Sequence, residues 1–73
     1  MERDVEIRGE MIRLGQLLKL AGVIDAGGEA AALLAATPVL VNGEPEQRRG
    51  RQLRAGDAVR VGDELLRVVH PRA

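Results

Sequence analysis

The sequence predicts an α+β domain in which a two-helix unit packs on a small, mainly antiparallel sheet, in the order β-α-α-β-β-β-β. Two observations indicate this fold class. Residues 11–21 and 29–36 place apolar side chains at helical spacing, and the segments on either side of them alternate polar and apolar side chains as strands do. The 73 residues contain no linker, repeat or low-complexity segment, so we expect a single domain.

The first strand and the first helix differ in their apolar period. Residues 4–8 alternate, with Val5 and Ile7 facing inward, which is typical of a half-buried strand. Residues 11–21 then carry one helical stripe, made of Leu14, Leu17, Leu18 and Ala21. Gly22 comes directly after this stripe and predicts a helix end at which a glycine takes the left-handed conformation.

A turn and a shorter helix follow. Residues 25–28 (DAGG) favour a turn, because glycine reaches positive φ without steric cost. Glu29 lies where a carboxylate interacts favourably with the positive end of a helix dipole. Residues 29–36 are rich in alanine and carry a second stripe, made of Ala30, Leu33 and Leu34. The short connection between the two helices predicts a compact αα unit.

The second half of the chain predicts short strands joined by turns. Residues 39–41 are strand-like and lead into Asn42-Gly43, the strongest hairpin signal in the sequence. We therefore expect residues 46–48 to be the returning strand.

Two more strands are expected near the end. Residues 52–54 lead into a turn at residues 55–57, and residues 58–61 alternate polar and apolar side chains again. Residues 65–69 form the last predicted strand, which should pair antiparallel with residues 58–61.

Composition limits both the core and the chemistry. The chain has no Phe, Tyr, Trp or Cys, so its core must be aliphatic, and disulfides, thiolate metal sites and thiol nucleophiles are excluded. No stretch approaches the roughly 20 apolar residues that span a bilayer, and residues 1–10 lack a basic segment followed by an apolar one. We expect a cytoplasmic protein with no membrane partner.

Charge is distributed unevenly along a chain whose formal net charge is zero. Residues 1–10 carry four acidic side chains against two arginines. Residues 48–60 have one acid, Asp57, against the arginines Arg48, Arg49, Arg51, Arg54 and Arg60. A neutral chain can therefore carry a basic face.

Several short motifs follow one another in a fixed order: Arg13-Leu14 at the start of the first helix, residues 39–44 (VLVNGE), Arg48, and residues 56–59 (GDAV). The series resembles the S-four RNA-binding domain, or alpha-L motif, which occurs in ribosomal small-subunit protein four, pseudouridine synthases and tyrosyl-tRNA synthetases. The similarity covers residues 12–62 and is strongest to small stand-alone bacterial members of the family.

The resemblance implies a translation-related protein that binds structured RNA, either ribosomal or transfer RNA, and associates with the ribosome. It implies no catalytic step, cofactor or metal, and the oligomeric state stays open. Family members bind RNA through basic side chains of the helix pair and the adjoining hairpin. The side chains indicated here are Arg13, Lys19, Arg48, Arg49, Arg51 and Arg54.

Two positions depart from the family pattern. Gly15 stands where an Asp often follows Arg-Leu, and residues 27–29 (GGE) replace a Ser-Arg pair that often opens the second helix. One usual basic contact is therefore missing, which affects RNA affinity or RNA choice.

The residues themselves indicate the same kind of site. Residues 48–51 (RRGR) form a basic loop suited to bidentate contact with adjacent phosphates, although a solvated arginine-rich loop is the alternative. Because the chain has no aromatic side chain on which single-stranded bases could stack, recognition should depend on phosphates and on the shape of folded RNA.

Other candidate chemistry is weaker. His70 is the only histidine and is expected to lie at a strand end. The paired acids Glu44 and Glu46, like Asp63-Glu64, lie in predicted turns, where a solvated carboxylate is the ordinary interpretation. Residues 27–28 could bind a phosphate before a helix, but no Walker lysine follows, and a helix cap explains them more simply.

Two other functions remain open. A β-grasp sulfur-carrier protein also has a VNGE-like turn and a late GD turn, but it ends in Gly-Gly, whereas this chain ends in residues 70–73 (HPRA) and has two helices before the turn. A protein-interaction module whose basic loop meets an acidic partner would need an exposed apolar patch. The apolar stripes predicted above are expected to be buried in the core, which leaves no such patch.

Overall fold

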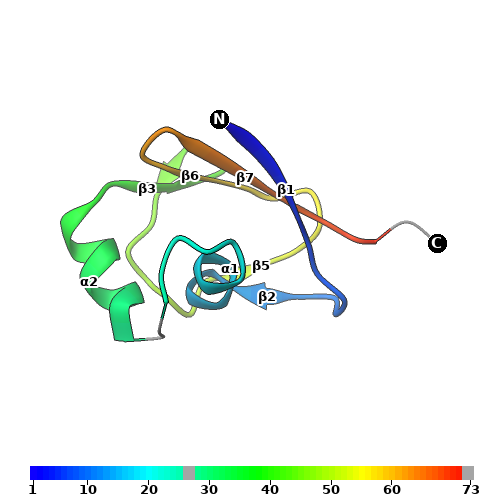
Figure 1. Ribbon diagram of the computed structural model, residues 1–73, viewed down its shortest axis with the longest axis horizontal. Helices are drawn as coiled ribbons and strands as arrows, with labels where there is room; N and C mark the ends of the chain where they lie inside the picture. The colour runs from blue at the N-terminus through cyan, green and yellow to red at the C-terminus, as the bar shows by residue number, and fades with distance from the viewer. Residues whose placement is uncertain (26–27, 72–73) are drawn as a thin grey trace.

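A computed structural model describes residues 1–25 and 28–71 of the chain, and the α+β class, with two helices and a mainly antiparallel sheet, is confirmed (Figure 1). The elements are, in chain order, β1 (Glu2–Glu6), β2 (Ile12–Arg13), α1 (Leu14–Leu20), α2 (Gly28–Ala36), β3 (Val39–Val41), β4 (Glu44–Pro45), β5 (Gln52–Leu53), β6 (Ala58–Val61) and β7 (Glu64–Val69).

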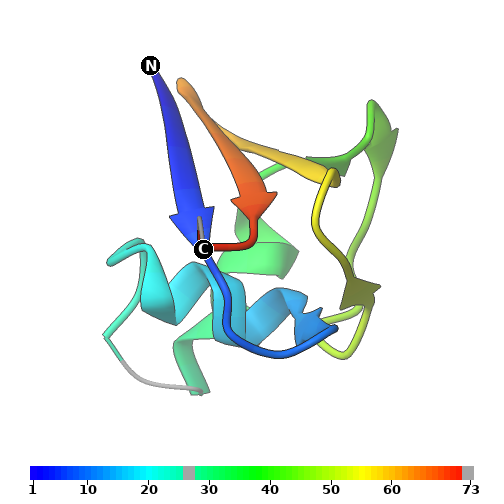
Figure 2. The same cartoon turned by 90° about the vertical axis from the view of Figure 1, so that its right-hand side faces the viewer.

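The main sheet has five strands in the order β1-β7-β6-β3-β4. β1 and β7 run parallel, and the other neighbours are antiparallel, including the expected pair of β6 and β7. β2 and β5 form a separate two-stranded ribbon. Both helices lie beneath the same face of the five-stranded sheet (Figures 1 and 2), so the fold has two layers.

The core between these layers is aliphatic, as the composition predicts. Each helix contributes the stripe expected from its sequence, and Leu53 enters the core from the β2–β5 ribbon. The largest fully buried side chains are Leu14, Leu17, Leu18, Leu53, Leu66, Val41, Val59 and Val68. Val5 and Ile7 are also buried, as expected, but β1 begins and ends two residues before the predicted strand of residues 4–8.

α1 begins later than predicted. The helix was expected from residue 11, but Ile12 and Arg13 are extended and pair with Leu53 and Gln52. Arg13 is the N-cap, with φ −85° and ψ 151°, and its backbone N–H donates to Oε1 of Gln16. The pairing of β2 with β5 therefore keeps Ile12 and Arg13 extended, although the apolar period predicts a helix from residue 11.

The end of α1 is the predicted glycine cap. Gly22 has φ 77°, a conformation that side chains with a Cβ rarely adopt. The N–H of Gly22 donates to the carbonyl of Lys19 at 3.1 Å, and the N–H of Val23 donates to that of Leu18 at 2.9 Å, which is the Schellman arrangement. Residues 26–27 of the predicted turn at 25–28 lie outside the described residues.

The Asn42-Gly43 hairpin is confirmed, but its returning strand is not where it was predicted. Asn42 and Gly43 have φ 52° and 85°, as a two-residue type I′ turn requires. This turn pairs Val41 directly with Glu44, so β4 occupies residues 44–45 rather than 46–48. The N–H of Glu46 still donates to the carbonyl of Val39 at 2.8 Å, and residues 46–51 form a loop.

Candidate nucleic-acid interface

The loop formed by residues 46–51, here called the basic loop, is attached to the start of α1. The first N–H groups of a helix have no partner within the helix. Here the N–H of Leu14 donates to the carbonyl of Arg51 at 2.9 Å, and the N–H of Gly15 donates to that of Arg49 at 2.9 Å. These bonds place the arginines of the loop beside Arg13 and the first turn of α1.

Glu46 organises the inside of this loop. Its side chain is only 7% exposed, so the expected solvated carboxylate is wrong. Oε2 accepts from the backbone N–H groups of Gln47 at 3.1 Å and Arg48 at 3.0 Å, and from Nε of Arg48 at 3.1 Å. Oε1 accepts from Nη2 of Arg48 at 3.2 Å and Nη1 of Arg51 at 2.9 Å.

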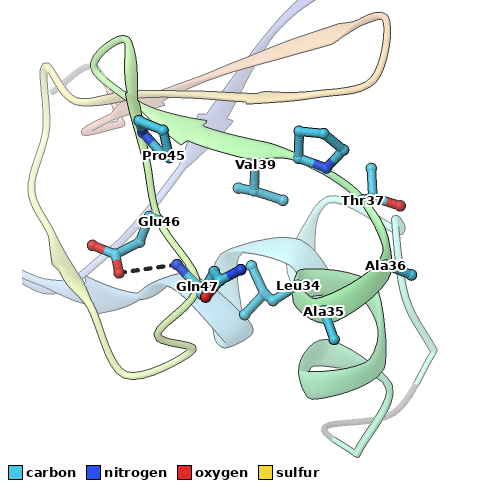
Figure 3. A pocket seen from close by; sticks show the side chains of 9 residues that line it. Leu34, Ala35, Ala36, Thr37, Val39, Pro45, Glu46 and Gln47 are labelled. Carbon is cyan, nitrogen blue, oxygen red and sulfur yellow. Dashed lines mark hydrogen bonds between the residues drawn. The ribbon is translucent and has the colours of Figure 1, made fainter.

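Figure 3 shows Glu46 at the edge of an apolar hollow between α2 and the β3–β4 hairpin, with its carboxylate beside the backbone nitrogen of Gln47. Hydrogen bonds from the side chain and the backbone of Arg48, and then from the Arg51 side chain, lower the pKa of Glu46 to about 2, although burial acts in the opposite direction. The same contact raises the pKa of Arg48. The carboxylate is therefore charged at neutral pH.

Arg48 and Arg51 consequently have a structural role that the sequence did not indicate. Both guanidinium groups share the negative charge of Glu46. The Arg48 side chain remains 76% exposed and the Arg51 side chain 36% exposed, so each can still face a ligand. Their charge is nevertheless partly compensated before any ligand arrives.

Three other predicted contacts come together in one shallow pocket of about 300 Å³. Arg13 reaches it from the N-cap of α1, Lys19 from the last turn of α1, and Arg49 from the basic loop. Within residues 1–25 and 28–71, none of these three side chains forms an ion pair. The full lining is Arg13, Gly15, Gln16, Lys19, Ala30, Arg49 and Gly50.

The pocket also contains residues that the sequence analysis did not assign to a site. In the sequence, Gly15 is only a departure from the family pattern, Gly50 is only part of the RRGR loop, and Gln16 gives no signal of a site. Ala30 was assigned to the core, where it is indeed buried. Arg54, the remaining predicted contact, does not line this pocket. It lies in the turn before β6, where its backbone N–H donates to Oδ2 of Asp57 at 2.8 Å.

The VNG hairpin and the GD turn, which carry much of the family resemblance, are in direct contact. Nδ2 of Asn42 donates to Oδ1 of Asp57 at 3.1 Å, and Oδ1 of Asn42 accepts from the N–H of Ala58 at 2.9 Å. Their first role is therefore to fix two loops to each other.

Acidic side chains gather on the other side of the molecule. In β1, Glu2, Asp4 and Glu6 are exposed, whereas the alternate residues Arg3 and Val5 face the helices. The same outer face also carries the exposed arginines Arg60 and Arg67, and Arg67 pairs with Glu2. Since the basic pocket lies on the helix side, the sheet keeps the acids of β1 away from the cations that line the pocket.

His70 lies after β7, and its Nε2 is 3.1 Å from the carbonyl oxygen of Gly9. Over the part of the chain that the structure describes, no three His, Cys, Asp or Glu side chains form a group that could hold a metal ion. The same residues include no helix with the length and apolar character needed to cross a membrane.

Two helices beneath a mainly antiparallel sheet, with a basic loop fixed to the first helix, define an alpha-L type of binding module. The chain belongs to the S4 domain family, whose model matches residues 5–69, so the S-four resemblance is confirmed. It is also 52% identical over 61 residues to a Bacillus subtilis (strain 168) protein described as a probable ribosome maturation protein, RlbA. The match covers 84% of this chain and 86% of that protein. Family membership favours the S-four interpretation over the β-grasp sulfur-carrier alternative.

Proposed function

We propose that the protein is a non-catalytic RNA-binding module that recognises structured ribosomal RNA through the face formed by α1 and the basic loop. The observation that carries this proposal is the pocket on which Arg13, Lys19 and Arg49 converge, none of them in an ion pair with the residues that the structure describes. Membership of the S4 domain family and the similarity to a ribosome maturation protein support it.

Physical chemistry favours RNA as the ligand of such a face. Guanidinium groups bind phosphate with paired hydrogen bonds, and neutralising phosphates releases counterions, which makes binding strong at low salt and weak at high salt. On the outer face of the sheet the acids of β1 lie beside Arg60 and Arg67, so the charges largely cancel and the helix side is the more favourable face for RNA. We propose that Arg13, Lys19 and Arg49 contact RNA directly. Arg48, Arg51 and Arg54 then add positive charge around them.

The test is the binding of a labelled ribosomal RNA hairpin across a series of salt concentrations. Replacing Arg13, Lys19 and Arg49 with Gln should weaken binding and reduce the slope of log K against log salt by about 2 to 3, close to one for each lost phosphate contact. A transfer RNA measured in parallel reports whether the RNA class matters.

A matched control removes the same charge elsewhere. Arg8, Arg60 and Arg67 do not line the pocket, and the ion pair of Arg67 with Glu2 is exposed, so replacing all three with Gln should cost little stability. If both triple variants bind RNA equally well, the proposed face is wrong. If the unsubstituted protein binds neither RNA at low salt, the proposed function is wrong.

A further inference from the structure

The pocket that Arg13, Lys19 and Arg49 line also has an uncharged part. This part consists of Gly15 and Gln16 of α1, Ala30 of α2 and Gly50 of the basic loop. Ala30 is only 1% exposed, so the uncharged surface open to a ligand comes mainly from Gly15, Gln16 and Gly50. A phosphate on the surface of an RNA helix could be bound by the surrounding cations alone and would leave the hollow empty.

Gly15 keeps this hollow open. A Cβ at this position would lie 3.5 Å from Cβ of Ala30 and 3.5 Å from Cβ and the carbonyl oxygen of Arg49. These are ordinary van der Waals distances, so a small side chain fits without strain, and a longer one would extend into the space between α2 and the basic loop. The absence of a side chain at residue 15 is what leaves room for a ligand group.

The combination of an uncharged lining and three cations matches one nucleotide, which has a flat, largely apolar base face and a phosphate attached to it. We propose that the pocket receives a single unpaired nucleotide of the bound RNA, with its base against the uncharged lining at Gly15 and its phosphate on Arg13, Lys19 and Arg49. This inference rests on the proposed function and names the RNA feature that the same site selects. Unpaired bases in loops and bulges are the parts of folded RNA that proteins can reach.

The experiment compares two RNA hairpins that differ only by one unpaired adenosine in the stem. The unsubstituted protein should bind the bulged hairpin roughly tenfold more tightly, which is the size expected for contacts to one base. Gly15→Leu, which fills the pocket and keeps every charge, should bring this ratio close to one, and Gly15→Ala should give an intermediate ratio.

Ala32→Leu is the matched control. Ala32 is exposed on α2, and two residues along a helix turn it by about 200° from Ala30, so the substitution adds the same bulk away from the pocket. It should leave the ratio at the value of the unsubstituted protein. Circular dichroism and thermal unfolding confirm that each variant is folded.

A second measurement does not depend on any variant. Placing 2-aminopurine at the unpaired position should give increased emission when the protein binds, because the base leaves its stacked neighbours and the chain has no Phe, Tyr or Trp to quench it. Equal affinity for the two hairpins, a ratio unchanged by Gly15→Leu, or unchanged emission would each overturn the inference while leaving RNA binding intact. Failure to bind either hairpin would overturn the proposed function together with it.

Discussion

The side-chain amide of Asn42 donates a hydrogen bond to the carboxylate of Asp57 at 3.1 Å, across 15 residues of the chain. The backbone N–H of Asn42 also donates to the carbonyl of Ala58 at 2.8 Å. The turn between β3 and β4 is thereby fixed to the turn that precedes β6. Hydrogen bonds within the fold thus account for residues that identify the family in the sequence.

Asn42→Gly isolates the contribution of this side chain. Glycine accepts the φ of 52° found at this position, so the turn is kept and only the side-chain hydrogen bonds are lost. The free energy of unfolding should fall by about 1 to 2 kcal/mol. Urea unfolding measures this change, and RNA affinity should stay within about twofold. Unchanged stability with a large loss of RNA affinity would instead mean that the hairpin contacts the RNA.

Glu46 should make the protein sensitive to acid. Its pKa is about 2 in the folded protein and 4.5 ordinarily. Because the folded pKa is the lower one, the carboxylate stabilises the fold fully above about pH 4.5 and loses that contribution as the pH falls towards 2. Glu46→Gln should be less stable at pH 7, by about 1 to 3 kcal/mol.

The stability of Glu46→Gln should also change less than that of the unsubstituted protein between pH 4.5 and pH 2. Glu44→Gln, an exposed substitution two residues earlier, is the control and should follow the unsubstituted protein. Thermal unfolding at a series of pH values checks both variants. Parallel pH profiles for Glu46→Gln and the unsubstituted protein would contradict the role assigned to Glu46.

The neighbouring residues Arg48 and Arg49 should behave differently when each is replaced by Gln. Arg49 faces the pocket and forms no ion pair within residues 1–25 and 28–71, so its loss should reduce RNA affinity by about 1 kcal/mol, or roughly fivefold at low salt, with little effect on stability. Arg48 holds Glu46, so its loss should lower stability at pH 7 and disturb the basic loop. Binding and unfolding measurements on both variants separate the two roles, and equal effects of the two substitutions would refute this division.

Arg3 is expected to affect stability and not RNA binding. Its Nη2 donates to the carbonyl of Ala21 at 2.9 Å and to Glu64 at 3.2 Å, so it joins β1 to the end of α1 and to β7. Arg3→Met keeps the aliphatic part of the side chain and should lower the free energy of unfolding by about 1 kcal/mol. Arg60→Met, an exposed position on β6, should cost less. A loss of RNA affinity in folded Arg3→Met would place this residue at the interface.

Much of the fold could be predicted because its signals are local. The stripes of both helices, the Gly22 cap and the Asn42-Gly43 turn each depend on a few neighbouring residues. The pairing of β2 with β5 could not be predicted, because strands of two residues have no period to detect. The parallel pairing of β1 with β7 was also missed, because alternation shows that a strand exists without showing its partner.

The types of residue in the candidate site could be predicted from the sequence. Their arrangement in space was harder to predict. The basic character of Arg13, Lys19 and Arg49 could be seen directly, but their convergence on one pocket depends on the backbone bonds between α1 and the basic loop. Glu46 appeared to be a solvated acid because nothing in a loop sequence indicates that two arginines and two backbone N–H groups surround one carboxylate. Only the structure therefore shows that Arg48 and Arg51 bind Glu46, whereas Arg49 lines the pocket.

The parallel pairing of β1 with β7 has a consequence for biosynthesis. Glu2 lies opposite Leu65 and Glu6 lies opposite Val69, so β1 pairs with a strand that follows both helices and the other strands described here. β7 must be synthesised before β1 finds this neighbour, and closing so long a loop is the entropically expensive and slow step in forming such a sheet. The helix pair can form earlier from local contacts. During synthesis the helical layer should therefore form before the sheet is complete.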